Sequence, residues 1–410
     1  MTTFLDAATD RLGTDSSSQR RRQLLELFES VQLPTTRDEV WRYAPLQDFS
    51  LEQYTLGESS PTRDLPEDIA STLAVASIVI RTHDGELREV TGSHPGVAIS
   101  AEPTGEACGD VTFAERYADD AFSLLSGAMA PCALTIRVEA NVVLDGPIVI
   151  VHDAASSSVF LNVRIDVARG GSLQVIEFLL GGEDALVVPV GEFVVNENAE
   201  LTLATYQRLA TSAWHIARTT TLLSRDARMR QSVVGLGSHY NRARNDAEFL
   251  GTGASNELHT TFLGSGDQVH DFRTHQNHKV GRSRSLLMSK GAVADTARSV
   301  YTGLIEIEKG AGRTDARQTN VNLLLSEQAH ADTVPNLDIR EHDVVCAHAS
   351  SVGPLDEMQI WYLESRGVVR DEAERLMVQG FFNEMTDSLP RPIAALVEQH
   401  VSDVLAKVTR

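Results

Sequence analysis

Two side chains near the end of the chain have the types and the spacing that suit metal chemistry. Cys346 and His348 stand two residues apart in the apolar run VVCAHASSVGPLDE, which ends at a Gly-Pro break. Residues i and i+2 of a β-strand point to the same face, roughly 6 to 7 Å apart. A thiolate and an imidazole on one face could both reach a single iron or zinc ion. Two ligands do not complete a site, so we expect the others to come from a partner protein.

A purely structural interpretation of this pair stays open. A free cysteine often behaves as a small buried apolar residue, and a histidine beside it then needs only a hydrogen bond. The other cysteines, Cys108 and Cys132, are far away in the sequence, and no CxxC pair occurs. Three widely spaced thiols indicate neither a disulfide framework nor a complete iron–sulfur ligand set, which takes about four thiolates.

The segment HDFRTHQNH is a second group of candidate metal ligands, with His270, His275 and His278. Histidine is a common metal ligand, so three of them close together suggest a metal site. In an unbroken strand, however, His270 and His278 share one face and His275 lies on the other. We therefore favour hydrogen-bonding roles on a strand or turn, and the metal site is the alternative.

The elements that must position these residues are short strands repeating at a nearly constant interval. From Cys132 onward, runs rich in Val, Leu, Ile and Thr alternate with polar or Gly-containing turns. A small residue opens a strand after a turn at intervals of 28, 28, 27, 29 and 28 residues, at Gly171, Ala199, Ala227, Ala254, Ser283 and Ala311. This period, with two or three strands in each, predicts a mainly β fold, a β-solenoid whose stacked coils share one core. A β-sandwich, the alternative, gives no reason for a constant interval.

Helical patterns flank the predicted solenoid. We expect an N-terminal helical region over residues 1–75, a mixed lead-in over 76–131, the solenoid over 132–350 and a C-terminal helical region over 351–410. Within the lead-in, Asp119 or Asp120 is expected to cap a short helix.

In the C-terminal region, Asp356 is expected to cap one helix, Gly367 to end it and Asp371 to start the next. The apolar residues of MQIWYLESRGV, Ile360 to Leu363, form either a helical core or a docking face for a partner. The last coil, which contains Cys346 and His348, exposes its strand edges unless this tail or another chain covers them.

Composition excludes several classes of function. The net charge of −21 argues against nonspecific nucleic-acid binding, which depends on Lys and Arg. No apolar run approaches the roughly 18 to 20 residues that span a bilayer, and the start lacks a signal-peptide pattern, so we expect a cytoplasmic protein with no membrane partner. The chain contains no P-loop, GxSxG or HExxH motif.

The segment from Asp295 to Val368 resembles the core signature of the SufB/SufD family of iron–sulfur cluster assembly proteins. The matching pieces are LLLS at 323–326, ADTVPNLDI at 331–339, C-x-H at 346–348, VGPLD at 352–356 and YLESRG at 362–367. Near the start, EVWRYAPLQDF at 39–49 resembles the E-x-WRY element of the SufD branch. The short chain and the sequence C-A-H-A-S also resemble SufD more than SufB, although Gly-Ala is more usual than Ala-Ser after the histidine.

The resemblance implies a right-handed parallel β-helix between two helical regions, which agrees with the repeat. It implies a non-catalytic scaffold subunit that pairs with SufB through the β-helix core. It also implies that a separate ATPase, SufC, docks on the C-terminal helical region, about residues 355–385. A homodimer is possible when the chain is isolated.

The interface Cys and His of the family map onto Cys346 and His348. The resemblance implies that these two residues help form a nascent iron–sulfur cluster, or bind iron, together with SufB ligands. No cofactor is then expected to be held stably by this chain alone. Two alternatives stay open: a carbohydrate-active β-helix enzyme, and a purely structural partner of SufB in which Cys346 and His348 are inert.

Overall fold

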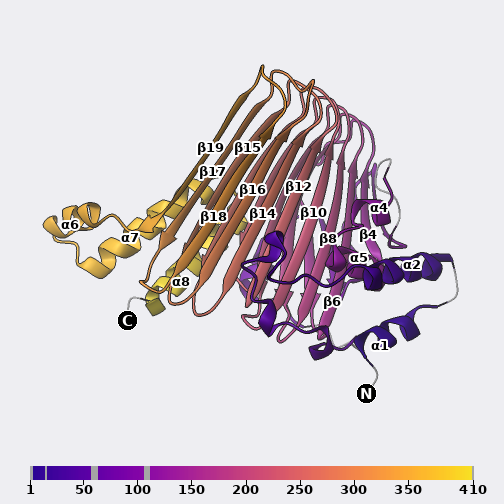
Figure 1. The fold of residues 1–410 in the computed structure, drawn as a ribbon, viewed down its shortest axis with the longest axis horizontal. Coiled ribbons are helices and arrows are strands. Elements are labelled where there is room, and N and C mark those ends of the chain that lie inside the picture. The colour runs from indigo at the N-terminus through magenta and orange to yellow at the C-terminus, as the bar shows by residue number, and fades with distance from the viewer. Residues whose placement is uncertain (1–2, 14–15, 57–62, 106–110, 409–410) are drawn as a thin grey trace.

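The structure is a computed structural model that describes residues 3–13, 16–56, 63–105 and 111–408. Two facing sheets form a β-solenoid in which consecutive strands alternate between the sheets from β4 onward (Figure 1). The solenoid prediction is therefore confirmed, and the β-sandwich alternative is wrong. Sheet A has 10 strands, in the spatial order β19 (Val345–Pro354), β17 (Asp315–Leu324), β15 (Arg284–Val293), β13 (Ser255–Gly264), β11 (Arg228–Gly235), β9 (Glu200–Leu209), β7 (Ser172–Gly181), β5 (Ile148–Ala154), β1 (Ile78–His83) and β2 (Glu86–Thr91).

Sheet B has 9 strands and lies across the interior, or lumen, from sheet A. Its strands are parallel except for the antiparallel pair β3–β4 at one edge, as β1–β2 is in sheet A. Because β1 pairs in parallel with β5, sheet A begins well before residue 132. The strands of sheet B are, in spatial order, β18 (His330–Ile339), β16 (Arg298–Ile307), β14 (Val269–His278), β12 (Tyr240–Phe249), β10 (Trp214–Leu223), β8 (Leu186–Val195), β6 (Ser158–Val167), β4 (Ala133–Val138) and β3 (Val97–Glu102).

The repeat seen in the sequence is a turn that precedes each strand of sheet A. In each turn the residue two positions before the strand has positive φ, a conformation that suits Gly, Asn and Asp and allows a tight reversal. A buried residue then follows, and at five of the six turns it is the small residue predicted from the sequence. The positive-φ residues are Gly170, Asn198, Asp226, Gly253, Arg282 and Arg313.

The sixth predicted position, Ala311, is wrong by three residues. Arg284 pairs with Asp315, so Thr314 is the counterpart of Ser283 and the last interval is 31 residues rather than 28. The two hydroxyl groups, Ser283 Oγ and Thr314 Oγ1, lie 3.2 Å apart. The turn after β16 is longer than the preceding ones, and its two glycines, Gly310 and Gly312, made Ala311 resemble the end of a shorter turn.

Helices cover the outer faces of both sheets, on opposite sides of the solenoid (Figure 1). The N-terminal segments pack on sheet B, where Phe122, Phe49 and Trp214 belong to one apolar cluster. Asp120, not Asp119, caps α5 by accepting a hydrogen bond from the Ser123 backbone at 3.2 Å. The helices on this side are α1 (Phe4–Arg11), α2 (Ser16–Ser30), α4 (Phe113–Arg116) and α5 (Ala121–Met129), with 3₁₀ turns at Glu39–Trp41, Leu46–Asp48 and Leu51–Gln53. By contrast, α3 (Glu67–Thr72) and the 3₁₀ turn Leu73–Val75 lie on the other side, where Ile69 packs against the outer face of sheet A.

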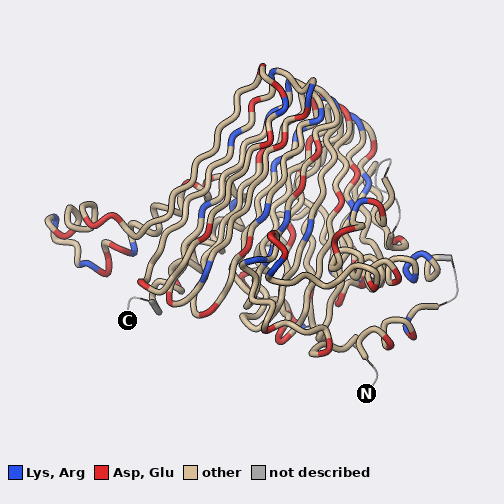
Figure 2. The backbone as a smooth tube through the Cα atoms, viewed as in Figure 1, with Lys and Arg blue, Asp and Glu red and all other residues tan. Residues whose placement is uncertain are grey.

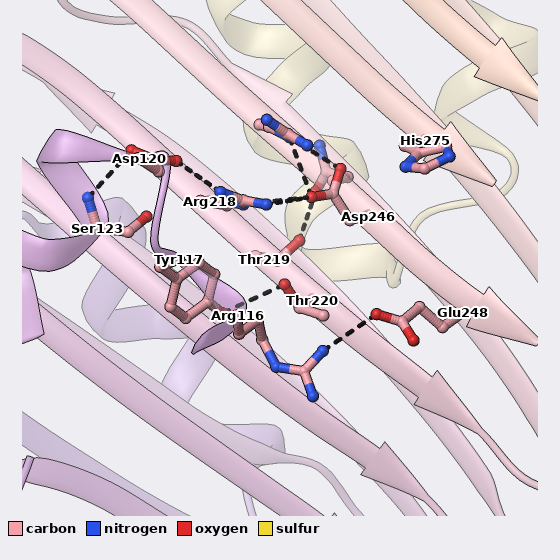
Figure 3. Close-up of polar contacts among 12 residues, drawn as sticks. Arg116, Tyr117, Asp120, Ser123, Arg218, Thr219, Thr220, Asp246, Glu248 and His275 are labelled. Atoms are coloured by element: carbon pink, nitrogen blue, oxygen red, sulfur yellow. Dashed lines mark hydrogen bonds and ion pairs between the residues drawn. The ribbon is translucent and has the colours of Figure 1, made fainter. Parts of the chain in front are cut away.

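Buried ion pairs join the N-terminal segments to sheet B. Figure 3 shows the Arg218 guanidinium between the carboxylates of Asp120 and Asp246, at 2.8 and 3.0 Å. On the neighbouring strands, the fully buried Asp271 carboxylate lies 2.6 Å from Arg242 and 3.0 Å from Arg273. Because charges removed from water are stable only when paired, the Asp120–Arg218 contact holds the N-terminal cover in one place, whereas the pairs of Asp271 lie within sheet B.

The C-terminal helices α6 (Glu357–Ser365), α7 (Arg370–Thr386) and α8 (Arg391–Val408) follow the last strand. Asp356 caps α6 and Gly367, with φ of 88°, follows its end, as predicted. The residue before α7 is Val369, so Asp371 lies in its first turn rather than at its cap. Phe382, Val397 and other side chains of α7 and α8 pack against the outer face of sheet A. No helix in the described ranges is long and apolar enough to cross a membrane.

Candidate functional site

Cys346 and His348 lie on the last strand of sheet A, and both occupy positions that face the lumen. β19 pairs in register with β17, so that Cys346 lies beside Ala316 and His348 beside Gln318. Ala316 and Gln318 are 0% and 1% exposed inside the solenoid. Since paired residues of neighbouring parallel strands point the same way, the thiol and the imidazole both point toward the open end of the lumen.

The two side chains differ in their surroundings. Cys346 is half-buried and packs against an apolar cluster that includes Ile305 and Ile307, whereas His348 is exposed. Burial, and to a smaller extent the nearby Asp315 carboxylate, raises the pKa of the Cys346 thiol above its ordinary value. The thiol is therefore protonated at neutral pH, and a metal ion that binds it must displace this proton.

Among the residues that the structure describes, no third ligand lies beside this pair. Within the described ranges, no group of three His, Cys, Asp or Glu side chains is arranged to hold a metal ion. Cys132 lies near the opposite end of the solenoid, where its Sγ is 3.4 Å from the Gly85 carbonyl oxygen, and Cys108 lies outside the described residues. Any metal held by Cys346 and His348 thus needs ligands from elsewhere.

The last coil, made of β18 and β19, is open on one side. β18 pairs with β16 and β19 pairs with β17, and no other strand of the described chain pairs with them. The C-terminal helices pack on the outer face of sheet A instead, and in Figure 1 α6 extends away from β19. The C-terminal tail therefore leaves the open edge of β19 uncovered, and this edge is accessible to a partner.

The open edge of β19 has few of the features that normally prevent strand pairing. Edge strands are usually protected by charged residues or by proline. β19 contains no Lys, Arg, Asp or Glu (Figure 2), and its one proline, Pro354, is its last residue. β18, by contrast, carries Pro335 at its middle and two aspartates, Asp332 and Asp338. The β19 edge is therefore the better surface for an added strand.

The three histidines of β14 divide between the two faces of the strand, as their spacing predicted. His270 and His278 are fully buried in the lumen, where burial lowers the pKa of each to about 3. His278 accepts or donates hydrogen bonds with Ser283 and Ser285 at 2.8 and 2.9 Å. His275 lies on the outer face (Figure 3), 3.1 Å from Glu306. The three imidazoles do not converge, so the metal-site alternative for them is wrong.

Sequence reasoning missed a group of amides just inside the open end. Gln318, Asn320 and Asn322 occupy successive lumen-facing positions of β17 and are 0 to 1% exposed. Alternation in DARQTNVNLL could have shown them, because all three share the parity of the buried Ala316. A run of amides on the core face of a strand is unusual, since burying an amide costs free energy unless it is hydrogen-bonded.

The first C-terminal helices expose large apolar side chains. Ile360 of α6 is buried, but Trp361 and Tyr362 are 62% and 54% exposed, and Met358 is 70% exposed. Val369, at the start of α7, is 71% exposed. Exposed apolar residues that lie together are typical of protein–protein contact sites, so the docking-face alternative fits this hairpin better than a helical core does.

Comparison with known proteins relates the whole chain to cluster assembly. Residues 149–381 match the family model described as SUF system FeS cluster assembly, SufBD core domain. The iron–sulfur cluster assembly protein SufD of Escherichia coli is 28% identical over 92% of this chain and 90% of its own length. SufD of Bacillus subtilis is 26% identical over 95% and 93%. A SufBD family protein of Mycobacterium tuberculosis is 29% identical over 90% and 89%.

The matched core spans more than half of the chain, from β5 through the open coil to α7. It contains the C-x-H element and the segment 295–368 on which the resemblance was based. The recognition made from the sequence is therefore confirmed, and the chain belongs to the SufB/SufD family of iron–sulfur cluster assembly proteins.

Proposed function

We propose that this chain is a SufD-type scaffold subunit that pairs with a SufB-type chain at its open coil and contributes ligands to a nascent iron–sulfur cluster. The observation that carries the proposal is the position of Cys346 and His348 on β19, an edge strand without Lys, Arg, Asp or Glu that no described strand or helix covers. A partner strand added to β19 would bring its own side chains next to these two. Iron and sulfide are then cargo, assembled at the contact and passed on.

The protonation state of Cys346 bears on how iron would load. Because the thiol pKa is raised, thiolate is scarce near neutral pH, and iron binding must release a proton. Loading is therefore expected to strengthen as pH rises. A basic or cationic partner group close to Cys346 would have the same effect by favouring the thiolate.

We propose that the partner ATPase, of the SufC type, docks on the hairpin of α6 and α7. The exposed Trp361, Tyr362 and Val369 support this assignment, because aromatic anchors dominate the energetics of many interfaces. ATP hydrolysis would then belong to the partner, and this chain would act without a catalytic residue of its own.

The test is reconstitution of the chain with its SufB-type and SufC-type partners, followed by iron and sulfide analysis. We expect Cys346→Ala and His348→Ala each to reduce the cluster formed while leaving the complex intact. Cys132→Ala is the matched control, because it removes another half-buried thiol at the far end of the solenoid. Unchanged cluster yield in both site variants would refute the ligand role.

A purely structural role for the pair is the second candidate. The packing of Cys346 against the cluster around Ile305 favours it. In that case Cys346→Ala lowers the melting temperature of the chain but not the cluster yield of the complex. If the purified chain forms only a homodimer through β19 and no SufB-type partner competes with it, the proposed pairing is wrong.

A further inference from the structure

Gln318 lies directly inside His348 in a column of lumen-facing residues that runs along sheet A. The paired residues of this column are His348, Gln318, Leu287, Leu258, Gln231 and Leu203. His348 has Gln318 on one side in this column and the open edge on the other. Any group that steadies the imidazole from within this chain's lumen is therefore best placed at Gln318.

The amide of Gln318 is buried without a hydrogen-bonding partner. Its side chain is 1% exposed, and neither Oε1 nor Nε2 forms a hydrogen bond within the described residues. A Cβ placed on Gly303, across the lumen, would lie 2.4 Å from Oε1 and 2.5 Å from Nε2, so the glycine leaves the space that the amide occupies. A polar group kept at such a position without a partner is unusual in a folded protein.

The other glutamine of the column, Gln231, is hydrogen-bonded and provides a comparison for Gln318. Gln231 Nε2 donates to Asn245 Oδ1 at 3.1 Å and lies 3.4 Å from Thr219 Oγ1. It is buried to a similar degree, at 3% exposure. Gln231 therefore has a packing and hydrogen-bonding role that the contacts of Gln318 do not offer.

We propose that Gln318 is the positioning residue for His348, with Oε1 accepting the ring N–H of the imidazole. A histidine that binds a metal through one nitrogen nearly always donates its other ring N–H to a carbonyl or carboxylate oxygen, which fixes the tautomer and the orientation of the ring. Gln318 Oε1 is such an acceptor in the neighbouring register position. The inference rests on the proposed metal-binding role of His348.

The first test needs no metal and uses the full chain bound to its SufB-type partner, because in the chain alone Gln318 Oε1 accepts no hydrogen bond within the described residues. Ring ¹⁵N spectra of histidine-labelled protein at alkaline pH report which nitrogen of His348 carries the proton, and His348→Gln assigns the signals. We expect one tautomer in the wild type, a mixture in Gln318→Leu, and a single tautomer again in Gln318→Glu, whose carboxylate accepts the same N–H. Identical His348 spectra in wild type and Gln318→Leu would overturn the proposal.

The second test measures Co²⁺ binding by the complex of this chain with its SufB-type partner. Loss of an outer hydrogen bond to a histidine ligand typically weakens metal affinity about 10- to 100-fold. We expect that loss in Gln318→Leu, near wild-type affinity in Gln318→Glu, and little change in the control Gln231→Leu, which lies deeper in the same column. Equal affinities of wild type and Gln318→Leu would contradict the role of Gln318.

Stability separates this role from a packing role. Gln318→Leu adds a third leucine next to Leu287 and Leu258, so its melting temperature should equal or exceed that of the wild type, whereas Gln231→Leu should lower it. A complex that binds no Co²⁺ even as wild type refutes the function proposed above. The tautomer measurement still decides whether Gln318 orients His348.

Discussion

The open edge of β19 allows a substitution that separates partner binding from folding. The Val345 N–H donates to the carbonyl of Thr314, the residue before β17, at 2.9 Å. In a parallel ladder, successive residues direct their backbone groups to opposite sides, so Ala349 continues the bonds to β17 while Ser350 presents its N–H to the open edge. Ser350→Pro should therefore remove a donor that only a partner strand uses.

The expected magnitude follows from the bonds that are lost. One backbone hydrogen bond contributes about 0.5–1.5 kcal/mol net, and 1.4 kcal/mol is tenfold in affinity, so the dissociation constant for a SufB-type partner should rise at least ~2- to 12-fold. Steric conflict of the proline ring with the added strand would increase this factor. The melting temperature of the isolated chain should change little, because β17 loses no bond.

Two control variants make this result interpretable. Ser350→Ala removes only the hydroxyl group, which lies 2.7 Å from Thr333 Oγ1, and should bind the partner as the wild type does. Ala349→Pro breaks the ladder to β17 and should lower the melting temperature clearly. Titration calorimetry and thermal unfolding measure the two quantities on the same samples. Wild-type affinity in Ser350→Pro, or an equal loss in Ser350→Ala, would refute strand addition at this edge.

Three further outcomes are expected. Burial raises the pKa of Glu192 from 4.5 to about 7, so the stability contributed by its protonated form is present below pH 4.5 and is lost as pH rises toward 7. Urea titrations at each pH should therefore show Glu192→Gln gaining about 3 kcal/mol of unfolding free energy relative to wild type over that window. Asp271→Ala leaves two buried guanidinium groups unpaired and should cost about 3–5 kcal/mol of unfolding free energy, whereas Asp267→Ala, at a side chain that is 80% exposed, should cost almost nothing. Trp361→Ala should weaken SufC-type binding by about 2 kcal/mol, roughly 30-fold, without a change in melting temperature; an unchanged affinity would contradict the docking site.

The sequence predicted the solenoid because its coils obey a local rule that repeats. Each turn needs a left-handed residue followed by a small one, and the chain supplies Gly, Asn or Asp at four of the six left-handed positions. Gly310 and Ala311 also satisfy this rule, but there the turn continues for three more residues and Arg313 takes the left-handed conformation before the strand, so the predicted position was wrong. Local spacing also predicted correctly that His270 and His278 lie on one face of β14 and His275 on the other, because this depends only on the alternation of side chains along a strand.

Other features of the site were not predictable in this way. The spacing of Cys346 and His348 places them on one face of β19. Neither face of this strand is distinctly apolar, so its sequence does not show which face meets the lumen. That fact comes from the register with β17, a tertiary property. The unpartnered state of Gln318 likewise depends on Gly303, which comes from the opposite sheet.

Several features that are costly in a folded protein coincide at the β19 end of this solenoid. The interior strands of both sheets are paired on both sides, and in the same lumen column as His348 the amide of Gln231 is hydrogen-bonded. At β19 an uncharged edge is left bare, a thiol and an imidazole face an unclosed lumen, and the amide of Gln318 behind them has no partner. Local and global preferences usually agree in a folded protein, and conflicts between them concentrate at functional sites. One added strand, supplied by a partner, would cover the edge and complete the ligand set. It would also hold the His348 imidazole where its ring N–H can donate to Gln318 Oε1.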